Sequence, residues 1–102
     1  PKYGTTMNSK QTRHLRGLAH HLKPMMQIGG QGITVALISA TDDALGFHEL
    51  IKVKLGDIEH RSEVKEAAAK LSDETGSDVI QIIGKTIVLF RQREKESNFR
   101  LP

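Results

Sequence analysis

Three glycines within four residues form the feature of this sequence that could most directly do chemistry. Gly29, Gly30 and Gly32 surround Gln31 in the run IGGQGIT, and Thr34 closes the run. Without Cβ atoms, glycines let the backbone approach a ligand closely and adopt positive φ. If a helix begins after Thr34, its free N–H groups favour an anion. The run is therefore a candidate phosphate-contacting turn, in which Gln31 and Thr34 offer hydrogen bonds, although a tight strand-to-helix connection would need the same glycines.

Positively charged residues precede these glycines without an acidic neighbour. Residues 1–41 hold five of the 15 Lys and Arg residues of the chain and none of its 12 Asp and Glu residues. A helix over residues 10–22 would place its cations and histidines opposite its apolar side. The fixed charges of this stretch indicate a polyanionic partner, because a solvated helix face usually mixes both signs; they are Lys10, Arg13, Arg16 and Lys23.

Four further cations are weaker candidates for the same surface. Lys52 and Lys54 alternate with apolar residues in a predicted strand, Lys85 lies at a predicted turn, and Arg91 ends a predicted strand. Each would serve equally well as an ordinary solvent-facing residue. Aromatic residues make up only 4% of the chain, so base stacking is not expected, and the predicted mode is shape and phosphate contact with RNA.

Several classes of function are disfavoured by what the sequence lacks. There is no Cys, which excludes disulfides and thiol catalysis and fits a reducing compartment, so a cytoplasmic location is expected. No apolar run could span a membrane. His20 and His21 point about 100° apart on a helix, and no carboxylate joins them, so neither a metal nor another cofactor is expected. No nucleophile motif such as G-x-S-x-G occurs, and an enzyme is not expected.

Hydrophobic periodicity predicts the element order α-β-α-β-α-β-β. Helices are predicted from Ser9, as N-cap, through residues 10–22, over 35–45 before Gly46, and over 62–75 before Gly76. Their apolar sides are Leu15, Leu18, Ala19 and Leu22 in the first, and Val35, Ile38 and Leu45 in the second. Strands are predicted over 25–28, 50–55, 79–83 and 86–91, the last two joined by a type II′ turn at Gly84-Lys85.

Two helical crossovers place the first three strands side by side in parallel, and the hairpin adds one antiparallel strand. The predicted fold class is α/β, a two-layer sandwich with a four-stranded mixed sheet.

Three segments resemble one known family. The run LRGLAHHLKPMMQIGGQGIT at residues 15–34 resembles the signature of the CRM domain (chloroplast RNA splicing and ribosome maturation), and more closely the stand-alone bacterial YhbY family. HELIKVK at 48–54 and GKTIVLFR at 84–91 are similar to two further segments of that family, which often has Tyr in place of Phe90. The resemblance covers about residues 9–91. Residues 1–8 are predicted to be a flexible segment or a non-native remnant, and 92–102 a frayed, mixed-charge tail.

The resemblance implies both a fold and a function. The fold would be like the C-terminal domain of translation initiation factor three, with the turn at residues 29–32 contacting RNA as the KH-domain loop does. The expected partner is RNA, in particular ribosomal RNA in precursors of the large ribosomal subunit, and the expected role is to assist ribosome assembly. Independently of the resemblance, the sequence shows no long apolar surface stripe, so a monomer is expected. The alternative is a protein-binding assembly factor that docks on ribosomal proteins or a partner enzyme.

Overall fold

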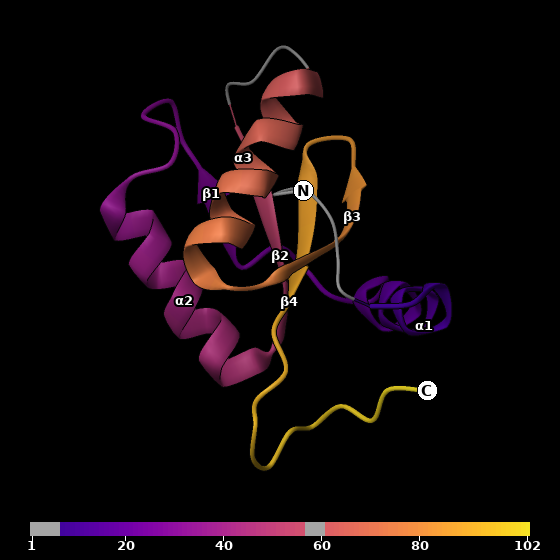
Figure 1. The fold of residues 1–102 in the computed structure, drawn as a ribbon. Helices are drawn as coiled ribbons and strands as arrows, with labels where there is room; N and C mark the ends of the chain where they lie inside the picture. Colours follow the sequence, from indigo (N-terminus) through magenta and orange to yellow (C-terminus); the bar gives the residue numbers. More distant parts are fainter. Residues whose placement is uncertain (1–6, 57–60) are drawn as a thin grey trace.

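The computed structural model describes residues 7–56 and 61–102, which form three helices and four strands (Figure 1). The helices are α1 (Ser9–Ala19), α2 (Val35–His48) and α3 (Arg61–Thr75). The strands are β1 (Met26–Ile28), β2 (Leu50–Leu55), β3 (Asp78–Ile83) and β4 (Thr86–Phe90). The predicted fold class and element order are confirmed.

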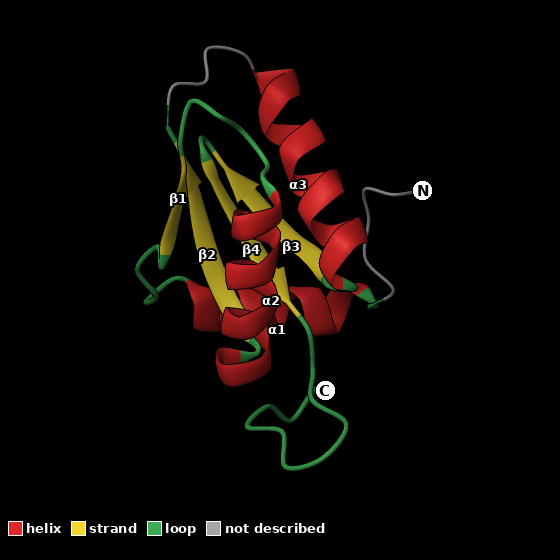
Figure 2. Cartoon of the chain, turned by 90° about the vertical axis from the view of Figure 1, so that its left-hand side faces the viewer, coloured by secondary structure: helices red, strands yellow, loops and turns green. Residues whose placement is uncertain are grey.

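The four strands form one mixed sheet in the order β1-β2-β4-β3 (Figure 2). β1 and β2 are parallel, and β4 is antiparallel to both of its neighbours. The prediction that the first three strands lie side by side is wrong for β3, because β4 separates it from β2. The carboxyl ends of β1 and β2 and the β3–β4 turn consequently meet at one end of the sheet. There the Leu55 N–H donates to the Lys85 carbonyl and the Gly56 N–H to the Ile28 carbonyl, each at 2.8 Å.

Apolar side chains pack on both faces of the sheet. α2 and α3 cover one face and form with it the predicted two-layer sandwich, whose core includes Leu45, Val53 and Leu71. α1 lies on the other face (Figure 2), where Leu15 and Ala19 pack against a second group of strand residues: Leu50, Ile80, Val88 and Phe90. Complete burial of a side chain such as Leu15 stabilises the fold by about 1.5–3 kcal/mol. The side of α1 that carries Arg13, Arg16 and Gly17 remains exposed.

α1 begins one residue earlier and ends earlier than predicted. Its N-cap is Asn8 rather than Ser9: the Gln11 N–H donates to Asn8 Oδ1 at 2.8 Å, and the Asn8 N–H donates back to Gln11 Oε1 at 3.2 Å. The helix ends at Ala19, and Leu18 and Leu22, predicted to be buried, are 42% and 37% exposed. Asn8 thus belongs to the folded domain, whereas residues 1–6 of the predicted N-terminal segment lie outside the described residues.

α2 continues past Gly46, where it was predicted to end. Its N-cap is Thr34, as predicted, and accepts a hydrogen bond from the Leu37 N–H at 3.1 Å. At the other end, Glu49 is the C-cap with a φ of 67°, a conformation usually left to glycine. Val35, predicted to be on the apolar side, is 84% exposed. The extension of α2 beyond Gly46 is explained by the contacts of Glu49 with the C-terminal tail.

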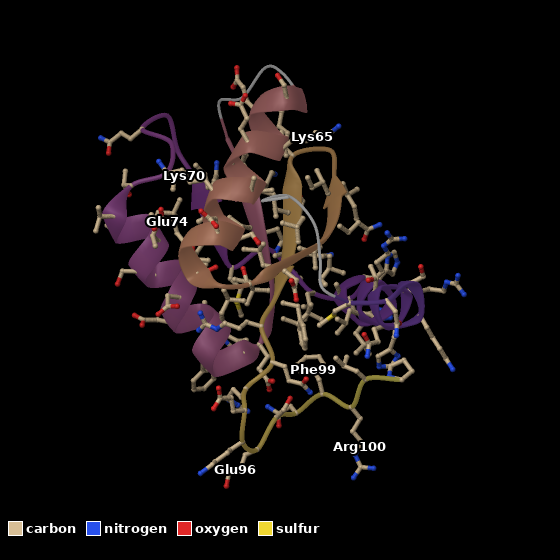
Figure 3. The ribbon with its side chains drawn as sticks, in the orientation of Figure 1. Lys65, Lys70, Glu74, Glu96, Phe99 and Arg100 are labelled. Atoms are coloured by element: carbon tan, nitrogen blue, oxygen red, sulfur yellow. The ribbon has the colours of Figure 1, made fainter. Side chains whose placement is uncertain are left out.

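The carboxylate of Glu49 anchors residues 92–102. The prediction that this tail is frayed is therefore wrong. The carboxylate accepts hydrogen bonds from the backbone N–H groups of Arg93 and Asn98 at 2.9 and 2.8 Å and from the Ser97 hydroxyl at 2.5 Å. Phe99 then points back toward the sheet (Figure 3), with its ring centroid 5.2 Å from that of Phe90. The tail and α1 together cover the end of the sheet face near Leu50 and Phe90.

Candidate nucleic-acid interface

Residues 29–32, the GGQG loop, join β1 to α2 at the carboxyl end of β1. The Gly32 N–H donates to the Gly29 carbonyl at 3.0 Å, and Gly32 has a φ of 73°, so the loop closes as a tight turn. A Cβ added at Gly29 would meet nothing within 4 Å, so packing does not explain the glycine there. The loop borders a shallow hollow lined also by Gln27 and Thr34. Because Thr34 caps α2, its hydroxyl can still donate a proton but its oxygen is already engaged.

A second hollow, the α1 groove, lies between α1 and the uncovered part of the sheet. Its residues come from three elements: Arg13, Arg16, Gly17 and His20 of α1, Lys52 of β2, and Gln81 and Ile83 of β3. Lys52 is half-buried in it, and Ile83 is 52% exposed. The groove exists because α1 covers only the Leu50 end of this sheet face. Of the residues predicted to bind RNA, the groove brings together Arg13 and Arg16 of α1 and Lys52 of β2.

Gly17 is an unusual residue for the wall of this groove. It lies inside α1, where glycine is less favourable than alanine by about 0.5–1 kcal/mol. A Cβ at this position would meet nothing within 4 Å, and the φ is not positive. Neither packing nor backbone geometry within the described residues therefore requires glycine here. Its effect is to leave the helix backbone bare beside Arg13 and Arg16.

Lys54 and Gln27 connect the α1 groove to the GGQG loop. These two residues are partners in the parallel β1–β2 register, and Gln27 lines the loop hollow. Lys52 follows on the same sheet face, about 7 Å along β2 from Lys54 at the usual rise per residue. Lys85, at the β3–β4 turn, is fixed to the same end of the sheet through its carbonyl.

These cations form what we call the basic surface: Lys10, Arg13, Arg16, Lys52, Lys54 and Lys85. Lys10 is exposed in the first turn of α1, and Lys23 is exposed in the connection from α1 to β1, just beyond the groove residues. Among the described residues that line the loop hollow and the α1 groove, none is Asp or Glu. The acidic side chains of α2 and α3 belong to the layer on the opposite face of the sheet, where they are mixed with cations such as Lys65 and Lys70.

Arg91 does not join the basic surface. Its guanidinium donates to the Asp42 carboxylate at 2.5 Å, to the Thr75 carbonyl at 2.6 Å and to the Asp42 carbonyl at 3.0 Å. Arg91 thereby links β4 to α2 and to the end of α3 on the helical face. These contacts give Arg91 a structural role, and they hold its guanidinium away from the basic surface.

Replacing Arg91 with Gln is expected to affect stability and not ligand binding. The shorter, uncharged Gln side chain cannot make all three hydrogen bonds of Arg91. Because the Arg91–Asp42 pair is partly exposed, the free energy of unfolding should fall by only about 1–2 kcal/mol. Urea denaturation measures this change. The variant is expected to bind RNA as tightly as the unmodified chain does. A large loss of affinity by the folded variant would show that Arg91 contacts RNA.

Two further kinds of site find no support in the residues that the structure describes. No helix there is both long and apolar enough to cross a membrane. No group of three or more His, Asp or Glu side chains is arranged to hold a metal ion in the described ranges.

Comparison with known families agrees with the geometry. The family model of the CRS1 / YhbY (CRM) domain matches residues 7–91, which include all three segments of the resemblance. The chain belongs to this family. A Haemophilus influenzae relative of this CRM domain, named as an RNA-binding protein, is 40% identical over 100 residues, which is 96% of this chain and 97% of the relative. The Bacillus subtilis protein YqeI, named as a probable RNA-binding protein, is 38% identical over 98 residues, 94% of this chain and 99% of that one.

A solved structure also superposes closely on the CRM domain. The solution structure of a Staphylococcus aureus protein, described as a candidate RNA-binding protein, has a TM-score of 0.82 and 39% sequence identity. The superposition covers 95% of this chain and 100% of the Staphylococcus protein. The relatives are named for RNA binding and not for a reaction, which agrees with the prediction that this CRM domain is not an enzyme.

Four groove residues of this CRM domain were absent from the predicted site: Gly17, His20, Gln81 and Ile83. Gln81 and Ile83 reach the α1 side because a bulge between Val79 and Gln81 shifts the alternation of β3. The sequence alone places neither the bulge nor β3 beside α1. The available signal was one polar residue, Gln81, within the otherwise apolar run VIQII.

Proposed function

We propose that this CRM domain binds RNA through its sugar-phosphate backbone, and that the RNA is ribosomal RNA in precursors of the large ribosomal subunit, whose assembly the protein assists. The observation that carries the proposal is the continuity of the GGQG loop with the basic surface across one face of the sheet. A cytoplasmic monomer is sufficient for this role.

The two parts of the interface have complementary chemistry. The GGQG loop offers bare backbone at the start of α2, where N–H groups and the helix dipole favour phosphate. The basic surface begins near that loop at Lys54, the register partner of Gln27, and continues through Lys52 to the arginines of the α1 groove. Its cations hold successive phosphates of one strand. The names of the relatives support RNA as the polyanion, and the resemblance to the YhbY family supports precursors of the large subunit.

Sucrose-gradient sedimentation of lysate at low magnesium tests the ribosomal part of the proposal. The protein should migrate with large-subunit precursors and leave them after RNase treatment or at raised salt. A protein that stays at the top of the gradient under every condition would refute the ribosomal role. Direct binding to purified RNA tests the backbone mechanism, because four to six phosphate contacts give a slope of log affinity against log salt of about −3 to −5.

Replacing Gly30 with Asp is expected to weaken RNA binding by about tenfold or more, because a carboxylate at the loop repels phosphate. Gly30 is not among the described glycines with positive φ, so a side chain there should not strain the backbone, and circular dichroism checks that each variant is folded. Fluorescence anisotropy with labelled RNA measures the loss. Gly30→Asn, which has nearly the same shape without the charge, is the control and should bind more tightly than Gly30→Asp; equal affinities of the two variants would argue against phosphate at this loop.

One observation favours the alternative of a protein-binding assembly factor. Leu18, Leu22 and Met25, at and after the end of α1, are 42%, 37% and 45% exposed. Exposed apolar residues within one short stretch are typical of protein contacts. Association with ribosomal particles that survives both raised salt and RNase would favour this alternative over backbone binding.

A further inference from the structure

We propose, building on the function proposed above, that the α1 groove is a subsite for single-stranded RNA, and that the RNA backbone crosses α1 directly over Gly17. The proposal adds a second contact region to the GGQG loop and assigns a role to three residues without one: Gly17, Gln81 and Ile83.

The size of the groove favours a single strand. Its volume is about 370 Å³, which is at the lower end of the range for sites that enclose small molecules and is sufficient for about one nucleotide. One wall of the groove is α1, and the other is formed by Gln81 and Ile83 of the edge strand β3; Lys52 of β2 also lines the groove. A duplex would have to rest on the rim of these walls, whereas a single strand can enter between them.

The two walls differ chemically, and this difference orients the strand. The α1 wall presents Arg13 and Arg16, which attract phosphate. The β3 wall presents the amide of Gln81 and the exposed side chain of Ile83. An amide can hydrogen-bond a 2′-hydroxyl or a base edge, and an aliphatic side chain can contact the face of a sugar or base. Phosphates are therefore placed toward α1 and sugars and bases toward β3.

Gly17 lets the backbone reach the α1 wall. Any side chain at this position would project into open space beside Arg13 and Arg16, since, apart from its chain neighbours and the helix's own backbone, a Cβ meets nothing within 4 Å. That space is the route by which a phosphate could contact both arginines at once. Gly17 destabilises α1 in the free protein, but it leaves the space in which a ligand can lie against the helix.

Replacing Gly17 with Gln tests this role, because Gln fills the space without adding charge and favours a helix more than Gly does. The matched control is Gly46→Gln: Gly46 is also an exposed helical glycine, in α2, and its Cβ would have only an ordinary contact at 3.7 Å. Binding is measured by anisotropy with a fluorescein-labelled single-stranded RNA of mixed sequence. Gly17→Gln should lose about tenfold or more in affinity, and Gly46→Gln less than about twofold.

Stability measurements separate blocking of the groove from damage to the fold. Gly17→Ala and Gly17→Gln should both melt at a temperature equal to or above that of the unmodified protein. If the unmodified protein binds RNA and Gly17→Gln binds equally well, the subsite is refuted while RNA binding stands. If the unmodified protein binds no RNA, the proposed function itself fails. Unlabelled duplex RNA that competes as well as the single strand would refute the preference for single strands.

Discussion

Replacing Glu49 with Gln should lower the free energy of unfolding by about 2–4 kcal/mol at neutral pH, the largest stability effect expected of a single polar substitution in this protein. The carboxylate is fully buried and receives two backbone N–H groups and one hydroxyl from the C-terminal tail. Gln keeps one acceptor oxygen but turns an NH₂ group toward the remaining donors. Urea denaturation followed by circular dichroism measures the difference.

The effect of this substitution should depend on pH in a defined direction. Burial alone would raise the pKa of the Glu49 carboxyl, but the hydrogen bonds from Ser97, Asn98 and Arg93, with the charge of Arg93, together place that pKa below its ordinary value of 4.5. The unfolded chain consequently binds a proton at higher pH than the folded protein does. The stabilisation by the carboxylate is complete above pH 4.5 and is lost as the pH falls through the folded pKa. The difference in free energy of unfolding between the unmodified protein and Glu49→Gln should become smaller as the pH falls from 4.5 through the folded pKa.

Glu94→Gln is the control for this prediction, since Glu94 is an exposed residue of the same tail. Its stability should change by less than about 0.5 kcal/mol at any pH. A Glu49→Gln variant as stable as this control would show that the tail is not anchored through the carboxylate.

Replacing both Arg13 and Arg16 with Glu should weaken RNA binding by about 100-fold or more and reduce the salt slope by about two. Both side chains line the α1 groove, and Arg13 and Arg16 are exposed, so folding should be little affected. Each substitution removes a phosphate contact and adds a repelling charge at the same place. Anisotropy titrations at several salt concentrations measure both quantities.

Lys65→Glu with Lys70→Glu is the matched control, because it changes the net charge equally. Both lysines project from α3 (Figure 3), in the layer on the other face of the sheet. If binding depends on the basic surface, this control should lose much less affinity. Equal losses in the two double variants would mean that RNA responds only to the overall charge of the protein.

Local patterns predicted those elements whose ends depend on local chemistry. The alternation of apolar and polar residues over 50–55 predicts β2 with its observed bounds, because successive side chains of a strand point to opposite faces of the sheet. Thr34 and Gly76 mark helix ends for reasons that lie in the cap itself: a side-chain acceptor in one case and a φ of 65° in the other. The GGQG loop and the cations of α1 were recognised in the same way, since residue type alone defines them.

Features that depend on contacts between distant residues were missed. Gly46 is the better local helix terminator, yet α2 ends at Glu49, whose positive φ is maintained by partners 44 to 49 positions away. Arg91 could not be assigned from sequence, because its partner Asp42 is also 49 positions away. The β3 wall of the α1 groove depends on where β4 enters the sheet and on the bulge, and neither has a local signature.

The central position of β4 has a consequence for how the chain is made. β4 is the last of the four strands of this sheet to be synthesised, and it pairs with both β2 and β3. Until Phe90 has left the ribosome, the nascent chain can form the β1–β2 pair and its helices but cannot join them to β3. β2 then carries an unpaired edge, which is a template for intermolecular association. Truncation before Thr86 should therefore produce an insoluble chain and not a smaller folded domain.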